Sequence, residues 1–510
     1  MEIIKNRLCH FGRMKADTDL LEESQTVIVP DVRPDAMEIL GAYGWLNVQE
    51  KGYVHNVLRI NGQVNCVICY LSVEEQKPCT LSAAVPFNLV REIEGAGEED
   101  RALSSVRLLN TTATMVNPRK LQVKVQLQVT ERLYEKQTIE YVEEIKNGEE
   151  HGVQCLAVSQ NICVVTDIVE KRLILNDEIR LSSRLPDEES ILLRKESEWV
   201  TEDIKLLQGK IMVRGHIDML LSSMSADGAF LGSGRYTIPF SQIIESDSVT
   251  SEDVIDLNYA PVREEVELVT DSDGITTMSF SFAAMVECMV KKYREVHAVR
   301  DVFSTRWEMR QEHSEICVPT ENENHRFTTA LKEEVLLDGC AAEILTASVV
   351  AEDVVFSHGE QTVGAGFYLW IAYKDPDGRV ATACKKIYGE ANGLKSMPGS
   401  GLCRITVKDV SAMLIGEDRV QFSFEAVFNC RECTGASWKL ICACTVDTAS
   451  RKEDTDRPSL ILRHINKDET VWGLAKAYNT IPALLASANK LDSEEVIPAG
   501  RMILIPFTDR

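Results

Sequence analysis

The 510-residue sequence contains no run of eighteen apolar residues, so we expect no membrane-spanning helix. Its first nineteen residues hold neither an apolar core nor a small-residue cleavage site, which predicts a cytoplasmic protein that is not secreted. Basic residues are also few, with 55 Lys and Arg against 79 Asp and Glu, and the net charge is −24. This excess of negative charge disfavours nucleic acid and anionic membrane surfaces as partners.

Known sets of catalytic residues are missing as well. The stretch from Gly359 to Gly366 lacks the Lys and Ser/Thr with which a P-loop binds phosphate and metal. The sequence has no G-x-S-x-G elbow, no H-E-x-x-H and no paired-carboxylate signature, and its nine histidines are dispersed. We therefore expect no enzyme and no cofactor.

Cysteines are too scattered for a disulfide framework. There are fifteen of them, an odd number, spread from Cys9 to Cys444, which suits a reducing cytosol. The best metal candidate is a loosely spaced zinc set of four thiolates around a predicted hairpin: Cys430, Cys433, Cys442 and Cys444. The alternative, which we favour, is that these side chains pack as small hydrophobic residues, as we expect for Cys288 at the matching position of an earlier copy.

What the sequence does contain is a pattern that recurs three times between about residues 20 and 445. The first copy has "RPDAMEIL" at Arg33–Leu40 and the second "LPDEESIL" at Leu185–Leu192, while the third keeps only "GCAAEIL" at Gly339–Leu345. A glycine turn follows in each copy, predicted at Asn61-Gly62, Gln208-Gly209 and His358-Gly359. Further turns are predicted at Asp227-Gly228 and Asp377-Gly378.

Apolar residues alternate after each of the three glycines, which predicts strands with one buried face. The buried positions expected in the three copies are Val64, Cys66, Ile68 and Tyr70; Ile211, Val213, Gly215 and Ile217; and Gln361, Val363, Ala365 and Phe367. Two copies also share "VPF" or "IPF", and two share a Phe-Ser-Phe strand with a Cys eight residues after its first Phe.

Many short alternating strands with turn signals predict a mainly β protein built from all-β sandwich or barrel domains in series. We place the three β domains at 1–150, 151–310 and 311–445, the third of them degenerate. The first twenty residues are a candidate extra strand of the first copy. Residues 446–459 are polar and aperiodic and predict a linker to a small α+β domain at 460–510.

The last domain has the order β-α-α-β. Its strands are predicted at Leu460–Ile465 and Arg501–Pro506. The first helix has an apolar face of Val471, Leu474, Ala475 and Tyr478, with Asp468 or Thr470 as its cap. The second is capped by Thr480 and ends at Asn489, with the apolar face Ile481, Leu484, Leu485 and Ala488.

This stretch, Leu460–Pro506, resembles the LysM domain. The resemblance is carried by Thr470, Trp472, Leu474, Ala475, Tyr478, Leu485, Asn489, Ile497, Gly500, Leu504, Ile505 and Pro506. It implies a groove between the loop before the first helix and the loop before the last strand. The residues predicted to bind a protein or a glycan there are Asp468, Glu469, Thr470, Val471, Trp472, Asn489, Ile497, Pro498 and Gly500. Core packing is the alternative role for Trp472 and Tyr478.

One departure from the LysM pattern bears on the ligand. The family usually has Gly-Asp-Thr where this sequence has Asp468-Glu469-Thr470. Losing the glycine adds a side chain and a charge where an N-acetyl sugar would approach the backbone, and this favours protein docking over glycan binding.

The upstream copies resemble the SPOCS domain of spore-forming Firmicutes, through "VIVPDVRPDAMEIL" (Val27–Leu40), "INGQVNCVICYL" (Ile60–Leu71) and "AAVPF" (Ala83–Phe87). SPOCS copies followed by one LysM domain are similar to the SipL type of spore-coat morphogenetic protein. That similarity implies a non-catalytic scaffold on the mother-cell side of the forespore surface. Its implied partners are other spore-coat proteins and the coat-basement morphogenetic ATPase, stage IV sporulation protein A. The alternative is a LysM-mediated binder of cortex or cell-wall peptidoglycan.

Overall fold

The computed structural model describes the chain except residues 55, 75–76, 94–96, 98, 181–190, 226–228, 271–275, 358–361, 393–402, 453–459, 493–495 and 508–510. The predicted fold class is confirmed, because strands dominate and the helices belong to a small α+β region at the C-terminus. In the described part of the chain, neither α-helix is long and apolar enough to cross a membrane.

Three units of the same design make up the β part. In the first, a sheet in the order β1-β6-β5 faces the consecutive strands β2, β3 and β4 across one apolar core. The strands are β1 (Glu2–Ile28), β2 (Ala36–Val54), β3 (Val57–Ser72), β4 (Pro78–Glu92), β5 (Arg101–Asn117) and β6 (Lys120–Lys146). The first twenty residues therefore belong to a strand of this unit, as the sequence suggested.

The second and third units have the same two layers. In each, two long paired strands and one further strand form one layer, and the strands between them in sequence form the other. The second has β7 (Val153–Arg180), β8 (Ile191–Leu207), β9 (Lys210–Met224), β10 (Phe230–Glu245), β11 (Val254–Thr270) and β12 (Thr276–Ser304). The third has β13 (Trp307–Leu336), β14 (Glu343–Ala351), β15 (Val355–Ser357), β16 (Thr362–Lys374), β17 (Val380–Asn392), β18 (Cys403–Leu414) and β19 (Arg419–Arg451). Strands of the three units thus span 2–146, 153–304 and 307–451, close to the predicted domain limits.

Alternating apolar residues form the sandwich cores as predicted. In β3 the side chains of Val64, Ile68 and Tyr70 are fully buried, and in β9 those of Ile211, Val213 and Ile217 are. Val363, Ala365 and Phe367 do the same in β16. Cys66 and Gly215 are buried as well, and the last predicted position, Gln361, lies outside the described residues. A period of two therefore identified the buried face of β3 and β9 correctly, whereas both faces of β16 are buried.

The predicted hairpin at Asn61-Gly62 is wrong, because β3 runs straight through it and the β2–β3 turn contains Asn56 at a φ of 63°. Gly62 instead faces Phe87 across the β3–β4 pair, and a Cβ on Gly62 would come 2.6 Å from that ring. In the second unit, Gly215 faces Phe240 in the same way. At each of these glycines, an aromatic ring from the neighbouring strand lies over the backbone. Coverage by such a ring stabilises a glycine within a sheet.

The copies are therefore correctly aligned by pairing Gly62 with Gly215, not with Gly209. Turns do occur at Gly209 and Gly378, which have φ values of 74° and 83° between β8 and β9 and between β16 and β17. The predicted turns at Asp227-Gly228 and His358-Gly359 lie outside the described residues, as does most of "LPDEESIL".

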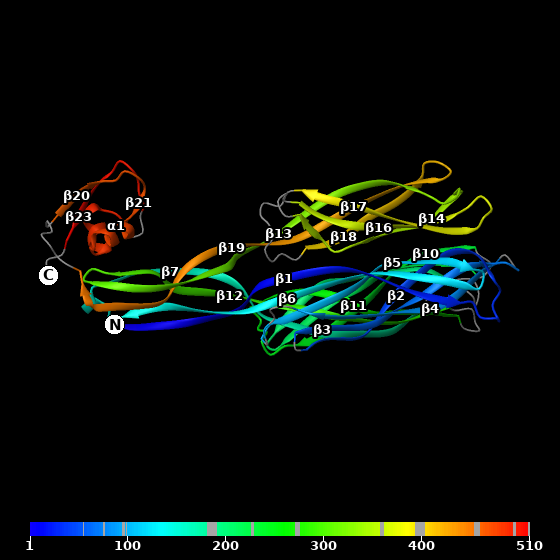
Figure 1. The fold of residues 1–510 in the computed structure, drawn as a ribbon, viewed down its shortest axis with the longest axis horizontal. Helices are drawn as coiled ribbons and strands as arrows, with labels where there is room; N and C mark the ends of the chain where they lie inside the picture. Colours follow the sequence, from blue (N-terminus) through cyan, green and yellow to red (C-terminus); the bar gives the residue numbers. More distant parts are fainter. Residues whose placement is uncertain are drawn as a thin grey trace.

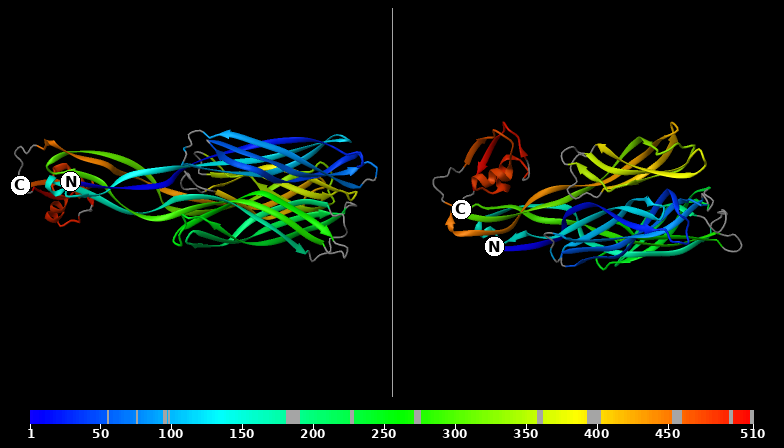
Figure 2. Two further views of the ribbon diagram at one scale, coloured as in Figure 1. Left: turned by 90° about the horizontal axis from the view of Figure 1, so that it is seen from below. Right: turned by 45° about the vertical axis from the view of Figure 1, so that its right-hand side comes forward.

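The units are not arranged end to end. They lie side by side, as the two views of Figure 2 show. One small core joins all three, with Leu40, Cys69 and Leu71 from the first, Leu193 and Met224 from the second, and Trp370, Ala372 and Val380 from the third. In addition, β2 pairs with β11 and merges sheets of the first two units into one of six strands.

A chain of polar contacts links the same three units, buried at the Arg132–Glu287 pair and exposed at Arg404. Arg132 on β6 forms an ion pair with Glu287 on β12, and their side chains are only 7% and 4% exposed. Asn258 on β11 donates to Glu287 Oε2 at 2.9 Å, and Arg404 on β18 donates to Asn258 Oδ1 at 2.7 Å. Because buried charges need partners, this chain favours one relative arrangement of the units.

Beyond the sandwiches, the long pairs β1–β6, β7–β12 and β13–β19 continue as three ribbons that form a stalk (Figure 1). The stalk has its own core, to which each ribbon contributes, through Leu8, Tyr141, Ile162, Val164, Val296, Ala298 and Leu440. At its tip the chain crosses from β6 to β7 and from β12 to β13. The segment predicted as a linker starts as part of this stalk, because residues 446–451 continue β19 and pair with β13.

Replacing Trp370 by Ala tests whether the shared core holds the units together. Its ring is 6% exposed and lies 4.5 Å from the Arg194 guanidinium of another unit. We expect a loss of about 3–5 kcal/mol in the free energy of unfolding, measured by urea titration with circular dichroism. Leu336→Ala, at a side chain 67% exposed, should cost less than about 0.5 kcal/mol. Equal effects of the two variants would contradict a shared core.

Candidate binding site in the C-terminal domain

The C-terminal domain packs two short helices on a two-stranded sheet. Strands β20 (Leu460–His464) and β23 (Met502–Pro506) pair antiparallel, and α1 (Val471–Tyr478) and α2 (Pro482–Asn489) cover one face. The core contains Ile465, Val471, Leu474, Ala475, Leu485, Ile497, Ile503 and Ile505. The predicted order β-α-α-β is thereby confirmed.

Two predicted groove loops lie against each other in this domain. The short strands β21 (Glu469–Thr470) and β22 (Val496–Ile497) pair, with Glu469 opposite Ile497. Beside this pair, the backbone N–H of Ala499 donates to Asp468 Oδ1 at 3.0 Å. The carboxylate at the position of the family's glycine therefore bridges the loops and occupies a backbone donor of the second loop.

Of the nine predicted binding residues, four are exposed at these loops: Asp468, Thr470, Pro498 and Gly500. Gly500 has a φ of 90°, which only glycine adopts easily, and its N–H donates to Ile465 O at 2.7 Å. Val471 and Ile497 are fully buried and support the loops from within. A ligand in the groove would thus meet mainly the four exposed residues.

Glu469 forms an ion pair inside the domain. Its carboxylate accepts a hydrogen bond from the Arg463 guanidinium at 2.9 Å, and its side chain is 17% exposed. The same guanidinium lies 5.3 Å from the ring of Tyr478 and donates to its hydroxyl at 3.2 Å. The second acidic residue of the loop therefore ties the sheet to the end of α1.

Two further predicted binding residues have internal roles. Thr470 is the N-cap of α1, because its hydroxyl accepts from Gly473 N at 3.0 Å, as predicted. Asn489 joins α2 to β23, since its amide donates to Leu485 O at 2.8 Å and to Leu504 O at 2.6 Å and accepts from Leu504 N at 2.8 Å. We therefore assign Asn489 to stability and not to the groove.

Some details of the second helix differ from the prediction. Its N-cap is Ile481, not Thr480, and the Thr480 hydroxyl donates instead to Pro506 O at 2.5 Å. The buried side chains of α2 are Pro482, Leu485 and Ala486, whereas Ala488 is exposed. The hydroxyl finds a partner on the last strand, so tertiary contact overrides the local cap.

Trp472 faces the stalk and not the groove. Its indole N–H donates to Asp301 Oδ2 at 2.8 Å, and its ring meets that of Phe303 edge to face at 5.0 Å between centroids. Lys476, one turn further along α1, donates to both Asp301 oxygens at 2.7 Å. Burial raises the pKa of the Asp301 carboxyl, but the hydrogen bonds from Lys476 and Trp472 outweigh that effect and keep this pKa below its ordinary value.

The end of β19 reinforces this contact. Lys452 donates through Nζ to Ser304 O at 3.0 Å and to Asn479 Oδ1 at 2.6 Å. Phe303 is 3% exposed and belongs to the same apolar cluster as Leu474 and Leu485. Sequence analysis missed Asp301 and Phe303, because nothing in the local pattern of β12 indicates that its tip meets a helix 170 residues later.

The candidate zinc set, which the sequence offered only as the less favoured alternative, does not fit the strand geometry. Cys430, Cys442 and Cys444 lie along the single strand β19, with no hairpin between them, so Cys430 and Cys444 are about 45 Å apart at about 3.3 Å per residue. Cys430 is joined to Cys403 by a disulfide, so not every thiol in the chain is free. The side chain of Cys433 lies outside the described residues. Among the described side chains, no group of three or more His, Cys, Asp and Glu is placed to hold a metal.

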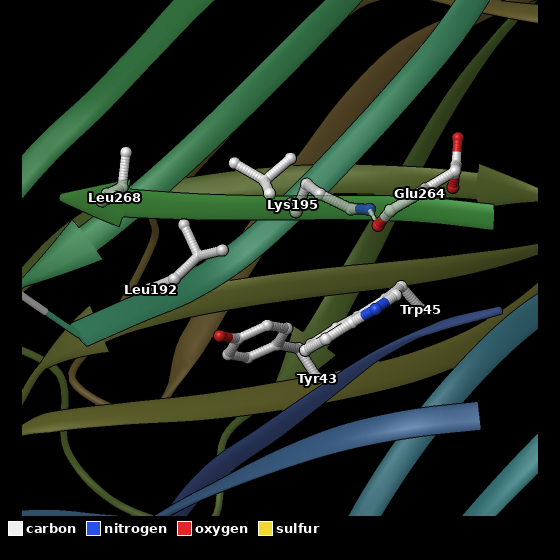
Figure 3. A pocket seen from close by; sticks show the side chains of 7 residues that line it. Tyr43, Trp45, Leu192, Lys195, Glu264 and Leu268 are labelled. Carbon is white, nitrogen blue, oxygen red and sulfur yellow. Dashed lines mark hydrogen bonds between the residues drawn. The ribbon is translucent and has the colours of Figure 1, made fainter. Parts of the chain in front are cut away.

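A cavity of about 100 Å³ lies between the first two units (Figure 3). Tyr43 and Trp45 stack below it at 6.0 Å between centroids, and Leu192 and Leu268 line the other side. The Lys195 ammonium donates to Glu264 O and lies 5.9 Å from the ring centroid of Trp45. Ligand pockets are commonly about 300–1,000 Å³, so this cavity is small for an organic ligand.

The charge of Lys195 is costly in this setting. Burial lowers the pKa of Lys195 to about 8, although Glu264 and Glu265 act in the opposite direction. An unfolded lysine keeps its ordinary pKa of about 10.4, so above pH 8 the unfolded chain binds the extra proton. The contribution of Lys195 to the free energy of unfolding therefore rises with pH from about 8 to 10.4.

This pH dependence is testable with Lys195→Met. We expect wild-type stability to rise relative to that of the variant between pH 7.5 and pH 10, as measured by urea unfolding at each pH. Lys205→Met, at a lysine whose side chain is 63% exposed on the same strand, is the control and should show a constant difference. A constant difference for Lys195→Met would contradict the buried charge.

Asn489→Ala tests the internal role of that residue. It removes three hydrogen bonds, among them the one that the Leu504 backbone N–H donates to Asn489, so we expect the domain to lose about 2–3 kcal/mol. Native-state hydrogen exchange at α2 and β23 would measure this. Ser487→Ala, at an exposed position of the same helix, should change exchange little. Weaker ligand binding by Asn489→Ala with unchanged exchange would point to the groove role instead.

Comparison with known proteins finds one family in this chain. The LysM domain model matches residues 464–506. No curated protein and no solved structure matches the chain. The matched range contains both α-helices, the β21–β22 pair and β23, with the loops that are predicted to form the groove. Residues 464–506 are therefore a LysM domain, attached to a stalked assembly of three β units.

Proposed function

We propose that this protein is a non-catalytic adaptor in the assembly of the bacterial spore coat. Its LysM domain would dock on the coat-basement morphogenetic ATPase, stage IV sporulation protein A, on the mother-cell side of the forespore surface. The order of SPOCS-like segments followed by one LysM domain supports this assignment. The lack of any catalytic signature in the sequence is consistent with it.

The contact between Asp468 and Ala499 carries the choice of a protein partner over a sugar. An N-acetyl glycan needs backbone donors and close approach in the groove, and here one donor is occupied by a carboxylate of the same domain. The exposed groove surface keeps Thr470, Pro498 and Gly500 beside Val496, which is 55% exposed. A mixed apolar and polar surface of this kind suits a protein contact.

The shape of the molecule suggests how an adaptor would work. The LysM domain lies at the tip of the stalk, and the three sandwiches lie at the other end (Figure 1). The protein would bridge one partner at the LysM groove and another on the sandwiches, and the two partners would not contact each other. The sequence predicted a linker before the LysM domain; the contacts of Trp472 and Lys452 with the stalk favour a fixed bridge.

Glycan binding is the second candidate. A LysM domain indicates binding of peptidoglycan or another glycan, and the groove loops of this domain are both in place. The adaptor would then attach the stalk to cortex or wall peptidoglycan. Release of the Ala499 donor would be required first, so the binding preference of the wild type, and not the Asp468 variant alone, separates the two candidates.

Binding of the full chain to purified ATPase and to insoluble peptidoglycan separates them. We expect the wild type to bind the ATPase and to be retained weakly on peptidoglycan. Asp468→Gly frees the Ala499 N–H and removes a charge, so retention on peptidoglycan should rise on the order of tenfold, the effect of about 1.4 kcal/mol. Lys467→Gly, at the exposed neighbouring position, is the control for added backbone freedom.

The adaptor assignment fails if the wild type is retained on peptidoglycan and ignores the ATPase. It also fails if Asp468→Gly and Lys467→Gly change both affinities equally, because the carboxylate would then have no specific role.

A further inference from the structure

We propose that the stalk tip positions the LysM binding site. Asp301 and Phe303 on β12 act as positioning residues for the predicted groove, which lies more than 150 residues away in sequence. This inference deepens the proposed function and rests on it. It implies that the LysM domain binds its partner with full affinity only while α1 is docked on the stalk.

The groove wall and the docked helix are one continuous piece of chain. β21 supplies the wall through Glu469 and Thr470, and α1 begins at the next residue, Val471. Thr470 caps α1 by accepting from Gly473, and Trp472 lies between these two residues in the first turn. A shift of Trp472 would therefore move the cap, the β21–β22 pair and the groove wall together.

The docking contacts restrain this turn from two directions. Asp301 holds Trp472 by its indole N–H and Lys476 by its ammonium, which fixes the helix along its axis. Phe303 lies edge to face against the Trp472 ring and within the apolar cluster of the LysM domain, which fixes its depth. The domain core is thus completed by a side chain of another domain.

Local strand geometry places Asp301 for this contact. The β7–β12 register shifts between Val299 and Asp301, which leaves Arg300 as an extra residue. Such bulges redirect side chains at functional positions. Val299 and Val302 remain buried in the stalk core on either side, so the position of Asp301 is set by the stalk and not by the LysM domain.

Four of the predicted groove residues stay exposed in the docked arrangement. Asp468, Thr470, Pro498 and Gly500 are exposed while Trp472 and Lys476 contact the stalk. Docking and partner binding are therefore compatible, and docking reduces the freedom that the groove would lose on binding. Coupling of this kind between two sites commonly changes affinity about 5- to 150-fold.

The experiment compares full-length wild type, Asp301→Ala and Glu308→Gln. Glu308 is exposed near the same tip and provides a matched loss of one carboxylate. Hydrogen exchange of α1 and small-angle scattering report docking without any ligand. We expect Asp301→Ala to increase exchange in α1, to enlarge the particle and to weaken ATPase binding on the order of tenfold, with no change for Glu308→Gln.

A charge swap separates positioning from simple destabilisation. The double variant Asp301→Lys with Lys476→Asp restores an ion pair across the interface, so it should recover part of the slower exchange and part of the affinity lost in Lys476→Asp alone. Recovery of both together is a result that general loss of stability does not produce.

Each failure has its own signature. If Asp301→Ala releases the domain but leaves ATPase affinity unchanged, the positioning role is wrong and the proposed function stands. If wild-type α1 exchanges as fast as in Asp301→Ala, the docking itself is wrong. If the wild type binds peptidoglycan and not the ATPase, the proposed function fails, and peptidoglycan affinity in the same variants tests the positioning role. If it binds neither, both proposals fail.

Discussion

The rest of this molecule depends on three long antiparallel strand pairs. Each of β1–β6, β7–β12 and β13–β19 forms one layer of a sandwich and then continues into the stalk. Continuous backbone pairing makes each ribbon stiff over its whole length, and apolar side chains from all three ribbons fill the space between them. The sandwiches and the tip are consequently parts of one body, joined by strands and not by linkers.

Burial at the junctions then decides how the units sit. The apolar cluster around Trp370 and the chain of Arg132, Glu287, Asn258 and Arg404 draw on all three units. Apolar contacts supply most of the stabilisation, whereas the buried ion pair penalises any arrangement that separates its partners. At the far end, Asp301 and Phe303 contact Trp472 and so join the LysM domain to the stalk.

Local patterns in the sequence predicted well wherever one short segment decides the outcome. The alternation from Val64 to Tyr70 identified a buried strand face, and the turn at Gly209 and the cap at Thr470 were predicted correctly because each depends on a few neighbouring residues. The hairpin prediction at Asn61-Gly62 was wrong because a glycine there suits either a turn or a strand position covered by an aromatic ring. Which of the two forms depends on Phe87, 25 residues away. The spacing of the cysteines of β19 left a zinc set around a hairpin open beside the favoured packing role, because it fits a hairpin or one strand equally well, and only pairing with β13 decides between them.

By itself, then, the sequence determined the mainly β class, the threefold repetition, the βααβ order of the last domain and the loops that form its groove, since these follow from periodicity, capping and turn chemistry over a few residues. Only the tertiary structure decided the roles of Asn489, Glu469 and Trp472. Each of them is polar or aromatic and suits a ligand as well as a neighbour, and each found a partner inside the protein: Leu504, Arg463 and Asp301. Such choices depend on which distant side chain comes within hydrogen-bonding distance, and that is set by the packing of whole strands and helices, not by local pattern.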